Sequence, residues 1–591
     1  MRVLLTTLNA KYIHSSLALR NLKAYCLPDI TDIAVTEYTI NNTLLDILAD
    51  IYSERPEVVG FACYIWNLEM TLKLADLVKK VLPEVKIILG GPEVSYEPFS
   101  ILGTHNYIDY IVLGEGEETL KQLLTSLGGS CNLDSITGLA FRRADIDVVK
   151  GCAQVVDNLN SIPFAYSEAD MDELEDRIIY YESSRGCPFS CQYCLSSATA
   201  GVRYYSLERV FRELKFFVDH DVKQVKFVDR TFNADKKHYL PILKFLAEQE
   251  CRTNFHFEIA ADLLDDEVLA FLQTVPKGRF QFEVGIQSTY NQTLNEIRRK
   301  NDWPHIVKAV SQVLSYGNIH VHLDLIVGLP YEDIDRFGQS FNDVFHLQPD
   351  MLQIGFLKLL KGSGVRERAE QHNYVHMDTP PYEVLANRYI SYGEIRELKL
   401  LEDIFNFLYN SGRFRHVLLF LIQTKYNDDA FKLFRSLTLY WEEKNLHRMA
   451  HSAKSLFKQL KEFCEQVFDD EKLTIGLELL KFDALMNDHG NIRPECLPWN
   501  GDCWNQETSA FWRNEAVVTK YLGQYRFGTW REIKKNYHIE IFEAELPNYL
   551  NLSSDKEGKS VVLFDYTQAD TQYFEIQPDD FWITGGEFDA L

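Results

Sequence analysis

Apolar and polar residues alternate along the first 145 residues in a pattern that predicts strands and helices in turn. Residues 67–82 place apolar side chains at i, i+3, i+4 and i+7, the spacing of an amphipathic helix. Short apolar runs on either side of such stretches predict buried strands at Arg2–Leu8, Asp32–Glu37, Val58–Ile65, Lys86–Leu89 and Tyr110–Leu113. This alternation predicts a doubly wound, Rossmann-like parallel sheet with helices on both faces.

A second alternating series begins at residue 178. Its predicted strands are Ile178–Ser183, Gln224–Val228, Phe255–Ala260, Phe280–Gly285, His320–Val327 and Leu352–Leu357. They predict a complete or partial β/α barrel, whose function resides at the C-terminal strand ends. Beyond about residue 375, long helical patterns dominate. We therefore predict an α/β protein in four parts: a doubly wound domain over 1–145, a linker over 146–176, a barrel over 177–375 and a mainly helical domain over 376–591.

Composition and charge narrow the functional classes. The chain has 591 residues, with 61 Lys and Arg against 86 Asp and Glu, a net charge of −25. That charge argues against extended nucleic-acid binding, which needs clustered cations. No window approaches about 18 uninterrupted apolar residues, so no membrane span is expected. The first residues suit a strand rather than a signal peptide, and eleven cysteines then indicate metal or redox sites in a reducing cytoplasm.

One cysteine motif stands out: Cys187-Pro-Phe-Ser-Cys191-Gln-Tyr-Cys194, after the first predicted barrel strand. A structural zinc site and a fully protein-ligated iron–sulfur cluster each use four ligands. Three thiolates on a four-iron cluster would leave one iron open, and an open metal position is where a cosubstrate binds. Structural zinc with a distant fourth ligand is the alternative.

This loop resembles that of the radical S-adenosylmethionine (SAM) superfamily. The segments FVDRTFN, FEIAADL, FEVGIQS and DLIVGLP extend the resemblance over about residues 178–360. It implies that Cys187, Cys191 and Cys194 hold a [4Fe–4S] cluster, that SAM chelates the fourth iron, and that an electron cleaves SAM to a 5′-deoxyadenosyl radical. It also implies that SAM is bound by Asp229, Glu258, Gln287, Ser288 and Gly328. Asp229 would stand in place of the family's Gly-Gly-Glu.

The N-terminal half resembles the cobalamin-binding subgroup of that superfamily, in the branch with a C-terminal domain of unknown function. The resemblance rests on LNAKYIHSSLALRNL, on DRTFN, and on the GGPE and GEGE turns. It implies cobalamin held between the first domain and the barrel, with contacts from His14, Gly90, Gly91, Gly114, Glu115 and Gly116. The Asp-x-His-x-x-Gly signature is absent, and His14 lies in the corresponding loop as a candidate cobalt ligand. The alternatives are a loop histidine that caps a helix or meets solvent, and glycines that only permit tight turns.

Strand periodicity gives a separate prediction for the barrel interior. In FHFEIA, FQFEVG and HVHLDLIV, the apolar residues occupy one face and the polar residues the other. We therefore expect Glu258, Glu283, His322 and Asp324 to line a polar lumen that binds SAM or substrate. A structural hydrogen-bond network is the alternative.

The other cysteines are weaker candidates for chemistry. An auxiliary cluster of Cys464, Cys496 and Cys503 is one interpretation, but buried free thiols are the favoured one. Cys26, Cys63 and Cys131 lie at long, dissimilar intervals, and nothing in their context supports an extra cluster. Trp499, Trp504, Trp512 and Trp530 suit either a core or a stacking surface.

The leading hypothesis is a cobalamin-dependent radical SAM enzyme, a methyltransferase at an unactivated centre. Its partners would be small-molecule cofactors and an electron donor, either a reductase or a flavodoxin or ferredoxin. Two alternatives remain. One is radical rearrangement, cyclisation or oxidation without methyl transfer, and the other is a zinc-stabilised binding protein.

Overall fold

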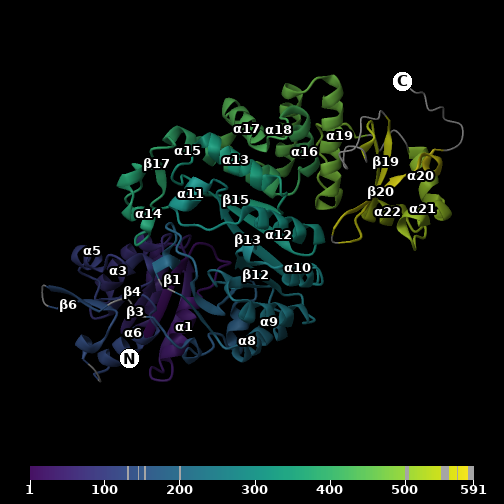
Figure 1. The fold of residues 1–591 in the computed structure, drawn as a ribbon. Helices are drawn as coiled ribbons and strands as arrows, with labels where there is room; N and C mark the ends of the chain where they lie inside the picture. The colour runs from purple at the N-terminus through teal and green to yellow at the C-terminus, as the bar shows by residue number, and fades with distance from the viewer. Residues whose placement is uncertain are drawn as a thin grey trace. The chain divides into compact units, whose positions relative to one another are not determined.

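The computed structural model describes residues 1–129, 132–143, 146–151, 155–198, 201–499, 505–546, 558–568 and 570–582. The chain divides into two compact units, Met1–Ile395 and Arg396–Leu591 (Figure 1). Within the described ranges, no helix is long and apolar enough to cross a membrane.

The first unit opens with a seven-stranded sheet in the order β2-β1-β3-β4-β5-β6-β7. Its parallel strands are β1 (Val3–Asn9), β2 (Ile33–Thr39), β3 (Val58–Ala62), β4 (Lys86–Gly90) and β5 (Tyr110–Val112). The helices around it are α1 (Leu17–Cys26), α2 (Leu44–Glu54), α3 (Leu68–Val81), α4 (Pro92–Ser95), α5 (Pro98–Thr104) and α6 (Glu117–Leu127). The predicted doubly wound fold is confirmed.

An antiparallel hairpin extends this sheet beyond its five parallel strands. It consists of β6 (Leu139–Arg143) and β7 (Ile146–Lys150), and β6 pairs with β5. The second of these strands falls in the segment 146–176 that we predicted as a linker. The hairpin covers the edge of β5, whose backbone groups would otherwise be left unpaired.

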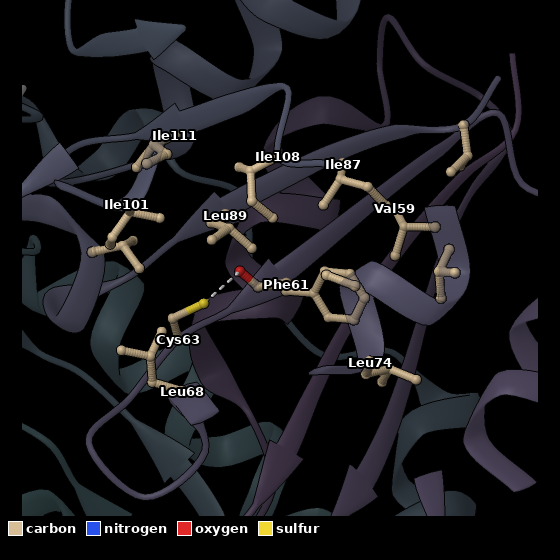
Figure 2. Packing of buried hydrophobic residues seen from close by; sticks show 14 of the residues in the cluster. Val59, Phe61, Cys63, Leu68, Leu74, Ile87, Leu89, Ile101, Ile108 and Ile111 are labelled. Carbon is tan, nitrogen blue, oxygen red and sulfur yellow. Dashed lines mark hydrogen bonds between the residues drawn. The ribbon is translucent and has the colours of Figure 1, made fainter. Parts of the chain in front are cut away.

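Two apolar clusters pack against this sheet. In one of them, Val59, Phe61, Ile87 and Leu89 pack with Leu74 of α3 (Figure 2).

Two cysteines belong to this packing. Cys63 lies in the first cluster, with its Sγ 3.7 Å from the carbonyl oxygen of Phe61, and Cys26 lies in the second. Burial raises the pKa of Cys26 to about 12 and that of Cys63 further still. Both are therefore neutral core thiols rather than cluster ligands; Cys131 lies outside the described residues.

The second sheet of this unit has six parallel strands in the order β15-β14-β13-β12-β11-β8. These are β8 (Ile179–Tyr181), β11 (Gln224–Phe227), β12 (Asn254–Ile259), β13 (Phe280–Gln287), β14 (His320–Val327) and β15 (Met351–Phe356). The order follows the sequence and does not close on itself, so the predicted barrel is a partial one. The first predicted strand is shorter than expected, because the chain leaves the sheet at Glu182.

Helices cover this partial barrel and begin at defined caps. They are α7 (Glu168–Glu173), α8 (Leu207–Asp219), α9 (Lys236–Ala247), α10 (Asp266–Leu272), α11 (Asn291–Glu296), α12 (Trp303–Tyr316), α13 (Ile334–Phe345) and α14 (Gly364–Glu367). Asp235, Asp265, Asp302 and Asp333 accept backbone N–H groups at the starts of α9, α10, α12 and α13. A small ribbon, β16 (Val375–His376) and β17 (Val384–Ala386), follows.

The second unit is mainly helical, as predicted. Its helices are α15 (Tyr392–Phe405, which begins in the first unit), α16 (Arg415–Lys425), α17 (Ala430–Glu443), α18 (Ala453–Val467), α19 (Asp470–Met486), α20 (Asn505–Arg513), α21 (Glu515–Leu522), α22 (Trp530–Asn536) and α24 (Pro578–Phe581). An antiparallel sheet of β18 (Tyr537–Phe542), β19 (Ser560–Asp565) and β20 (Gln572–Ile576) follows α22.

Aromatic residues and a cysteine in this unit serve its core. Trp512 is buried in an apolar cluster against which Trp530 packs, while the indole N–H of Trp499 donates to the carbonyl oxygen of Pro494. Cys464 is buried in α18, and burial raises its pKa to about 12. Trp504 and Cys503 lie outside the described residues.

Candidate active site

The cysteine motif begins in a hairpin that the sequence did not predict. Its strands β9 (Ser184–Cys187) and β10 (Gly201–Tyr204) are antiparallel, and Cys187 ends β9. Gly186 has φ +98°, and a Cβ there would lie 2.1 Å from the carbonyl oxygen of Gly201. Only glycine allows so close an approach. The hairpin therefore fixes the position at which the cysteine loop starts.

The three cysteines open into one cavity of about 160 Å³ at the C-terminal ends of the barrel strands. The other residues around it are Phe189, Tyr193, Ser196, Arg230, Thr231, Glu258, Ile259, Ala260, Glu283, Gly285, Gln287, Arg299 and Asp324. The cavity thus brings together the cysteine loop and side chains from the ends of β11 to β14. It includes two of the predicted SAM contacts, Glu258 and Gln287, and two further predicted lumen residues, Glu283 and Asp324.

The donor set of this cavity fits a metal cluster and a polar cosubstrate. None of the eight cysteines in the described parts of the chain forms a disulfide, and this includes the three of the motif. The buried Oε1 of Gln287, at the cavity wall, has no hydrogen-bond partner. A buried acceptor of this kind is costly unless something fills it. These features fit a cluster on the thiols and a hydrogen-bond donor beside Gln287.

Sequence reasoning missed Arg299, which lies beside the thiols. Its Nη1 is 4.0 Å from Cys191 Sγ, and its guanidinium also donates to the carbonyl oxygen of Gly285. Burial raises the pKa of Cys191, and the positive charge of Arg299 opposes that shift. The cation thereby favours the thiolate, which is the form that binds metal. Nothing local in the sequence distinguished Arg299 from its neighbour Arg298.

Asp229 differs from its predicted role as a SAM contact. It is 1% exposed and is not among the residues that line the cavity. Its carboxylate accepts hydrogen bonds from the Ser183 N–H at 2.9 Å, the Ser183 Oγ at 2.7 Å and the Ser184 Oγ at 2.5 Å. Burial raises its pKa to about 6. Asp229 therefore anchors the start of β9 and positions the cysteine loop from behind.

An Asp229→Asn chain is expected to lose about 1–3 kcal/mol of stability, because an amide cannot accept from all three donors. Iron incorporated per chain on anaerobic reconstitution is expected to fall as the loop loosens. Asp266→Asn, which changes an exposed carboxylate on α10, is the matched control and should behave as the wild type. Equal stability and iron content in both variants would contradict the anchoring role.

Ser288 and Gly328 also lie behind the cavity rather than on its wall. Ser288 is fully buried and donates to Glu332 Oε1 at 2.8 Å. The carbonyl oxygen of Gly328 accepts from the Tyr374 hydroxyl and the Asn387 amide, each at 2.9 Å. Both residues hold the ends of β13 and β14 in place, and their direct contact with SAM stays a prediction.

The carboxyl of Glu332 makes this support sensitive to pH. Burial raises its pKa from 4.5 to about 7. The folded chain therefore keeps Glu332 protonated at pH values where the unfolded chain has already released this proton. The free energy of unfolding then falls as the pH rises from about 4.5 to about 7. Glu332→Gln removes the charge and keeps an acceptor for Ser288 and Ser340. At pH 8 the variant is therefore expected to exceed the wild type by up to about 3 kcal/mol.

The measurement is urea unfolding at pH 5 and pH 8. The advantage of Glu332→Gln should disappear at pH 5, where the wild-type carboxyl is protonated. A difference of the same size at both pH values would show that ionisation of Glu332 is not its cause.

The predicted polar lumen carries a dense set of charges. Glu283 Oε2 lies 3.1 Å from Lys226 Nζ and 3.0 Å from His256 Nε2. Burial alone would raise the pKa of Glu283, but His256 and Lys226 lower it to about 2. Burial, and then the charge of Glu283, raise the pKa of neighbouring Glu258 to about 7. His322 stands behind the wall, with its Nε2 3.0 Å from Asp324 Oδ1.

The loops that follow β1, β4 and β5 hold the predicted cobalamin contacts. His14 Nδ1 lies 2.8 Å from the Tyr180 hydroxyl, which places this loop against the first barrel strand. Burial lowers the pKa of His14, so its imidazole is neutral near pH 7. Gly91 has φ +109°, and a Cβ there would lie 2.6 Å from the Cys63 carbonyl oxygen. Gly90 and Gly91 therefore bring the ends of β3 and β4 close together.

The turn after β5 contains two glycines that allow its tight backbone and a glutamate that forms ion pairs. Gly114 has φ +73°, and Gly116 precedes α6, where a Cβ would meet Leu22 at 3.2 Å. Glu115 is engaged by protein groups: it pairs with Arg203, lies 3.4 Å from Arg185, and accepts from the Val156 N–H. Glu115 therefore links this turn to the β9–β10 hairpin, and its contact with cobalamin stays a prediction.

Aromatic side chains that the sequence analysis did not single out border these turns. Tyr64 and Trp66 follow β3 with their rings stacked at 4.6 Å, and Trp66 is 45% exposed. Tyr96 ends α4; burial and the nearby Cys194 raise its pKa. An exposed aromatic surface beside glycine turns, at the C-terminal edge of a parallel sheet, fits a flat cofactor.

Three family models match the chain. They are the B12 binding domain over residues 3–124, the radical SAM superfamily over 181–344, and a protein family of unknown function (DUF4080) over 370–564. The chain carries a radical SAM domain. A B12 binding domain precedes this domain in the sequence and the DUF4080 domain follows it, the arrangement that the sequence resemblance implied.

Curated relatives of this chain include several enzymes. It is 31% identical to the cobalamin-dependent radical SAM methyltransferase TokK of Streptomyces tokunonensis, over 49% of this chain and 44% of that one. It is 29% identical, over 49% and 44%, to 2-(S-pantetheinyl)-carbapenam-3-carboxylate methyltransferase of Streptantibioticus cattleyicolor. An anaerobic magnesium-protoporphyrin IX monomethyl ester cyclase of Rubrivivax gelatinosus is 23% identical over 54% and 60%. The chain thus spans less than half the length of the first two.

Solved structures share the fold of this chain. The cobalamin-dependent radical enzyme OxsB, with aqua-cobalamin and SAM bound, has a TM-score of 0.57 and 15% identity, over 82% of this chain and 79% of that one. The methyltransferase TsrM from Kitasatospora setae, with cobalamin and a [4Fe–4S] cluster bound, has a TM-score of 0.55 and 16% identity, over 65% and 82%.

Proposed function

We propose that this chain is a cobalamin-dependent radical SAM methyltransferase that acts at an unactivated centre. The observation that carries the proposal is the cavity in which the three cysteine thiols meet polar side chains from the barrel strand ends, within a chain that also has a B12 binding domain. The named methyltransferases among its relatives support methyl transfer.

The proposal assigns the residues as follows. Cys187, Cys191 and Cys194 hold a [4Fe–4S] cluster, while Glu258 and Gln287 contact SAM. Cobalamin lies against the loops of the B12 binding domain, where it contacts His14, Gly90, Gly91, Gly114 and Gly116. We keep 1–145, 146–176, 177–375 and 376–591 as the proposed division of the chain, and β7 then marks the start of the second segment.

When bound, these groups supply an electron to cleave SAM, an adenosyl radical to activate the substrate, and a methyl group for transfer. The chain's own residues bind and orient them. Arg299 favours the thiolate form of Cys191, and the open acceptor of Gln287 receives a donor from the cosubstrate. Apolar residues on the other faces of β12 and β13, such as Phe257 and Phe282, seal the barrel wall against water.

The cluster needs a one-electron donor, and we propose a reductase or a flavodoxin or ferredoxin. None of the described cysteines forms a disulfide, which supports the reducing cytoplasm as the compartment.

The test is anaerobic reconstitution of the full chain with iron, sulfide, cobalamin and SAM. The products should be 5′-deoxyadenosine and, with methyl transfer, S-adenosylhomocysteine. The likeness to a cyclase makes radical chemistry without methyl transfer the second candidate, and 5′-deoxyadenosine without S-adenosylhomocysteine would favour it. One zinc per chain with neither iron nor sulfide would overturn both.

A further inference from the structure

Two histidines inside the barrel have ring nitrogens without hydrogen bonds. His256 on β12 and His322 on β14 are 7% and 6% exposed. The Nε2 atom of each is buried and has no hydrogen-bond partner. The Oδ1 atom of Asp324 is likewise buried without a hydrogen-bond partner. Burying polar atoms without partners costs free energy, so several of them at one place indicate a missing ligand.

These orphan atoms converge with a carboxylate. Ligand atoms of Glu283, His322 and Asp324 all lie within 4.8 Å of one another. His322 Nε2 is 3.0 Å from Asp324 Oδ1, and His256 Nε2 is 3.0 Å from Glu283 Oε2, yet neither nitrogen makes a hydrogen bond. Two ligands about 2.1 Å from a tetrahedral ion are themselves about 3.4 Å apart, within a few tenths of an ångström of these contacts. The spacing therefore suits ligands that share an ion.

We propose that His256, Glu283, His322 and Asp324, here called the inner cluster, bind one divalent transition-metal ion such as zinc. Imidazole and carboxylate ligands suit first-row ions of this kind, whereas thiolates are absent from the inner cluster. Parallel strand pairing supplies the convergence: Glu283 pairs in register with His322, and His322 and Asp324 share one face of β14. The proposal goes beyond the cluster, SAM and cobalamin sites.

An internal ion pair is the competing explanation. Lys226 Nζ donates to Glu283 Oε2 at 3.1 Å, which neutralises part of the negative charge. That contact gives no hydrogen bond to either imidazole nitrogen or to Asp324 Oδ1. A bound ion would give a partner to all three atoms, the two imidazole nitrogens and Asp324 Oδ1. The flexible Lys226 side chain can withdraw from Glu283 as the ion enters.

Because Glu283 and Asp324 also line the cavity of the cysteine thiols, the ion would lie beside the reacting groups. There it would offer a Lewis-acidic position for an oxygen of the substrate, such as a carboxylate, hydroxyl or carbonyl.

The experiment titrates zinc into the holoenzyme reconstituted with its iron–sulfur cluster, without SAM or substrate. We expect one zinc per chain in addition to the cluster iron, and at least about tenfold weaker binding in His322→Gln, since even outer partners of metal ligands are worth about that much. His320→Gln, which changes a half-exposed histidine on the same strand, is the matched control and should bind as the wild type.

Zinc X-ray absorption identifies the ligands. A shell of nitrogen and oxygen at about 2.0–2.2 Å supports the inner cluster, and a sulfur shell at about 2.3 Å overturns it. If His322→Gln fails to fold or to retain its iron, Asp324→Asn against Asp350→Asn repeats the comparison. No zinc in the wild type, or equal affinity in the variant and the wild type, also overturns the proposal. Because the readout is zinc alone, this result is independent of methyl transfer.

Discussion

A Cys191→Ala chain is expected to lose its four-iron cluster and, with it, the reductive cleavage of SAM. Cys191 is the central thiol of the motif and lies in the cavity with Cys187, Cys194 and Arg299. Two remaining thiols cannot hold a cluster that needs three protein ligands. The rate of 5′-deoxyadenosine formation should fall by at least about 100-fold, because removing a ligand costs more than the 10- to 100-fold typical of its outer partners.

The measurements are iron and sulfide per chain and 5′-deoxyadenosine released under strong reductant. Cys251→Ala is the matched control, because Cys251 is a free thiol outside the cavity, and it should keep wild-type iron and turnover. A Cys191→Ala chain that retained full iron and cleaved SAM would refute the assignment of this motif.

Replacing Arg185 with methionine is expected to destabilise the first unit by about 3–5 kcal/mol, the cost of leaving buried charges unpaired. Arg185 Nη2 lies 2.6 Å from Glu117 Oε1 and 2.7 Å from Glu182 Oε1, and its Nη1 is 3.4 Å from Glu115 Oε2. Burial alone would lower the pKa of Arg185, but Glu182 and Glu117 raise it. One guanidinium thus joins the B12 binding domain to the hairpin that ends at Cys187.

Urea unfolding of the two chains measures this effect. Arg252→Met is the matched control: Arg252 pairs with Asp221, but its side chain is 89% exposed, so solvent screens the pair and little change is expected. Equal losses in the two variants would show that the Arg185 network adds nothing beyond an ordinary surface pair.

Much of the fold followed from the sequence because its determinants are local. Five parallel strands of the first sheet and six of the second match predicted runs to within a few residues, since apolar periodicity directly reports the face that a strand buries. The β9–β10 hairpin was not predicted because it depends on the close approach of Gly186 to the backbone at Gly201. These two residues lie on opposite sides of the cysteine motif in the sequence.

The site was predicted only in part, because local patterns identify its residues but not the contacts that they make. Glu258 and Gln287 line the cavity as expected, whereas Asp229 and Ser288 support it from behind. Glu258 lies within β12 and follows its alternation, whereas Asp229 and Ser288 come after the last residues of β11 and β13. There the chain has left the sheet, and a side chain's direction no longer follows the alternation of the strand.

The sequence alone determined the two parallel sheets, the mainly helical C-terminal unit, the three-cysteine loop and the polar face of the barrel strands, because each depends on residues close in the chain. Only the tertiary structure decided which polar residues meet. It placed Arg299 beside Cys191, used Glu115 to hold Arg185 and Arg203, and gathered the inner cluster from three strands. Such pairings depend on distances between elements, which no local pattern of side chains records.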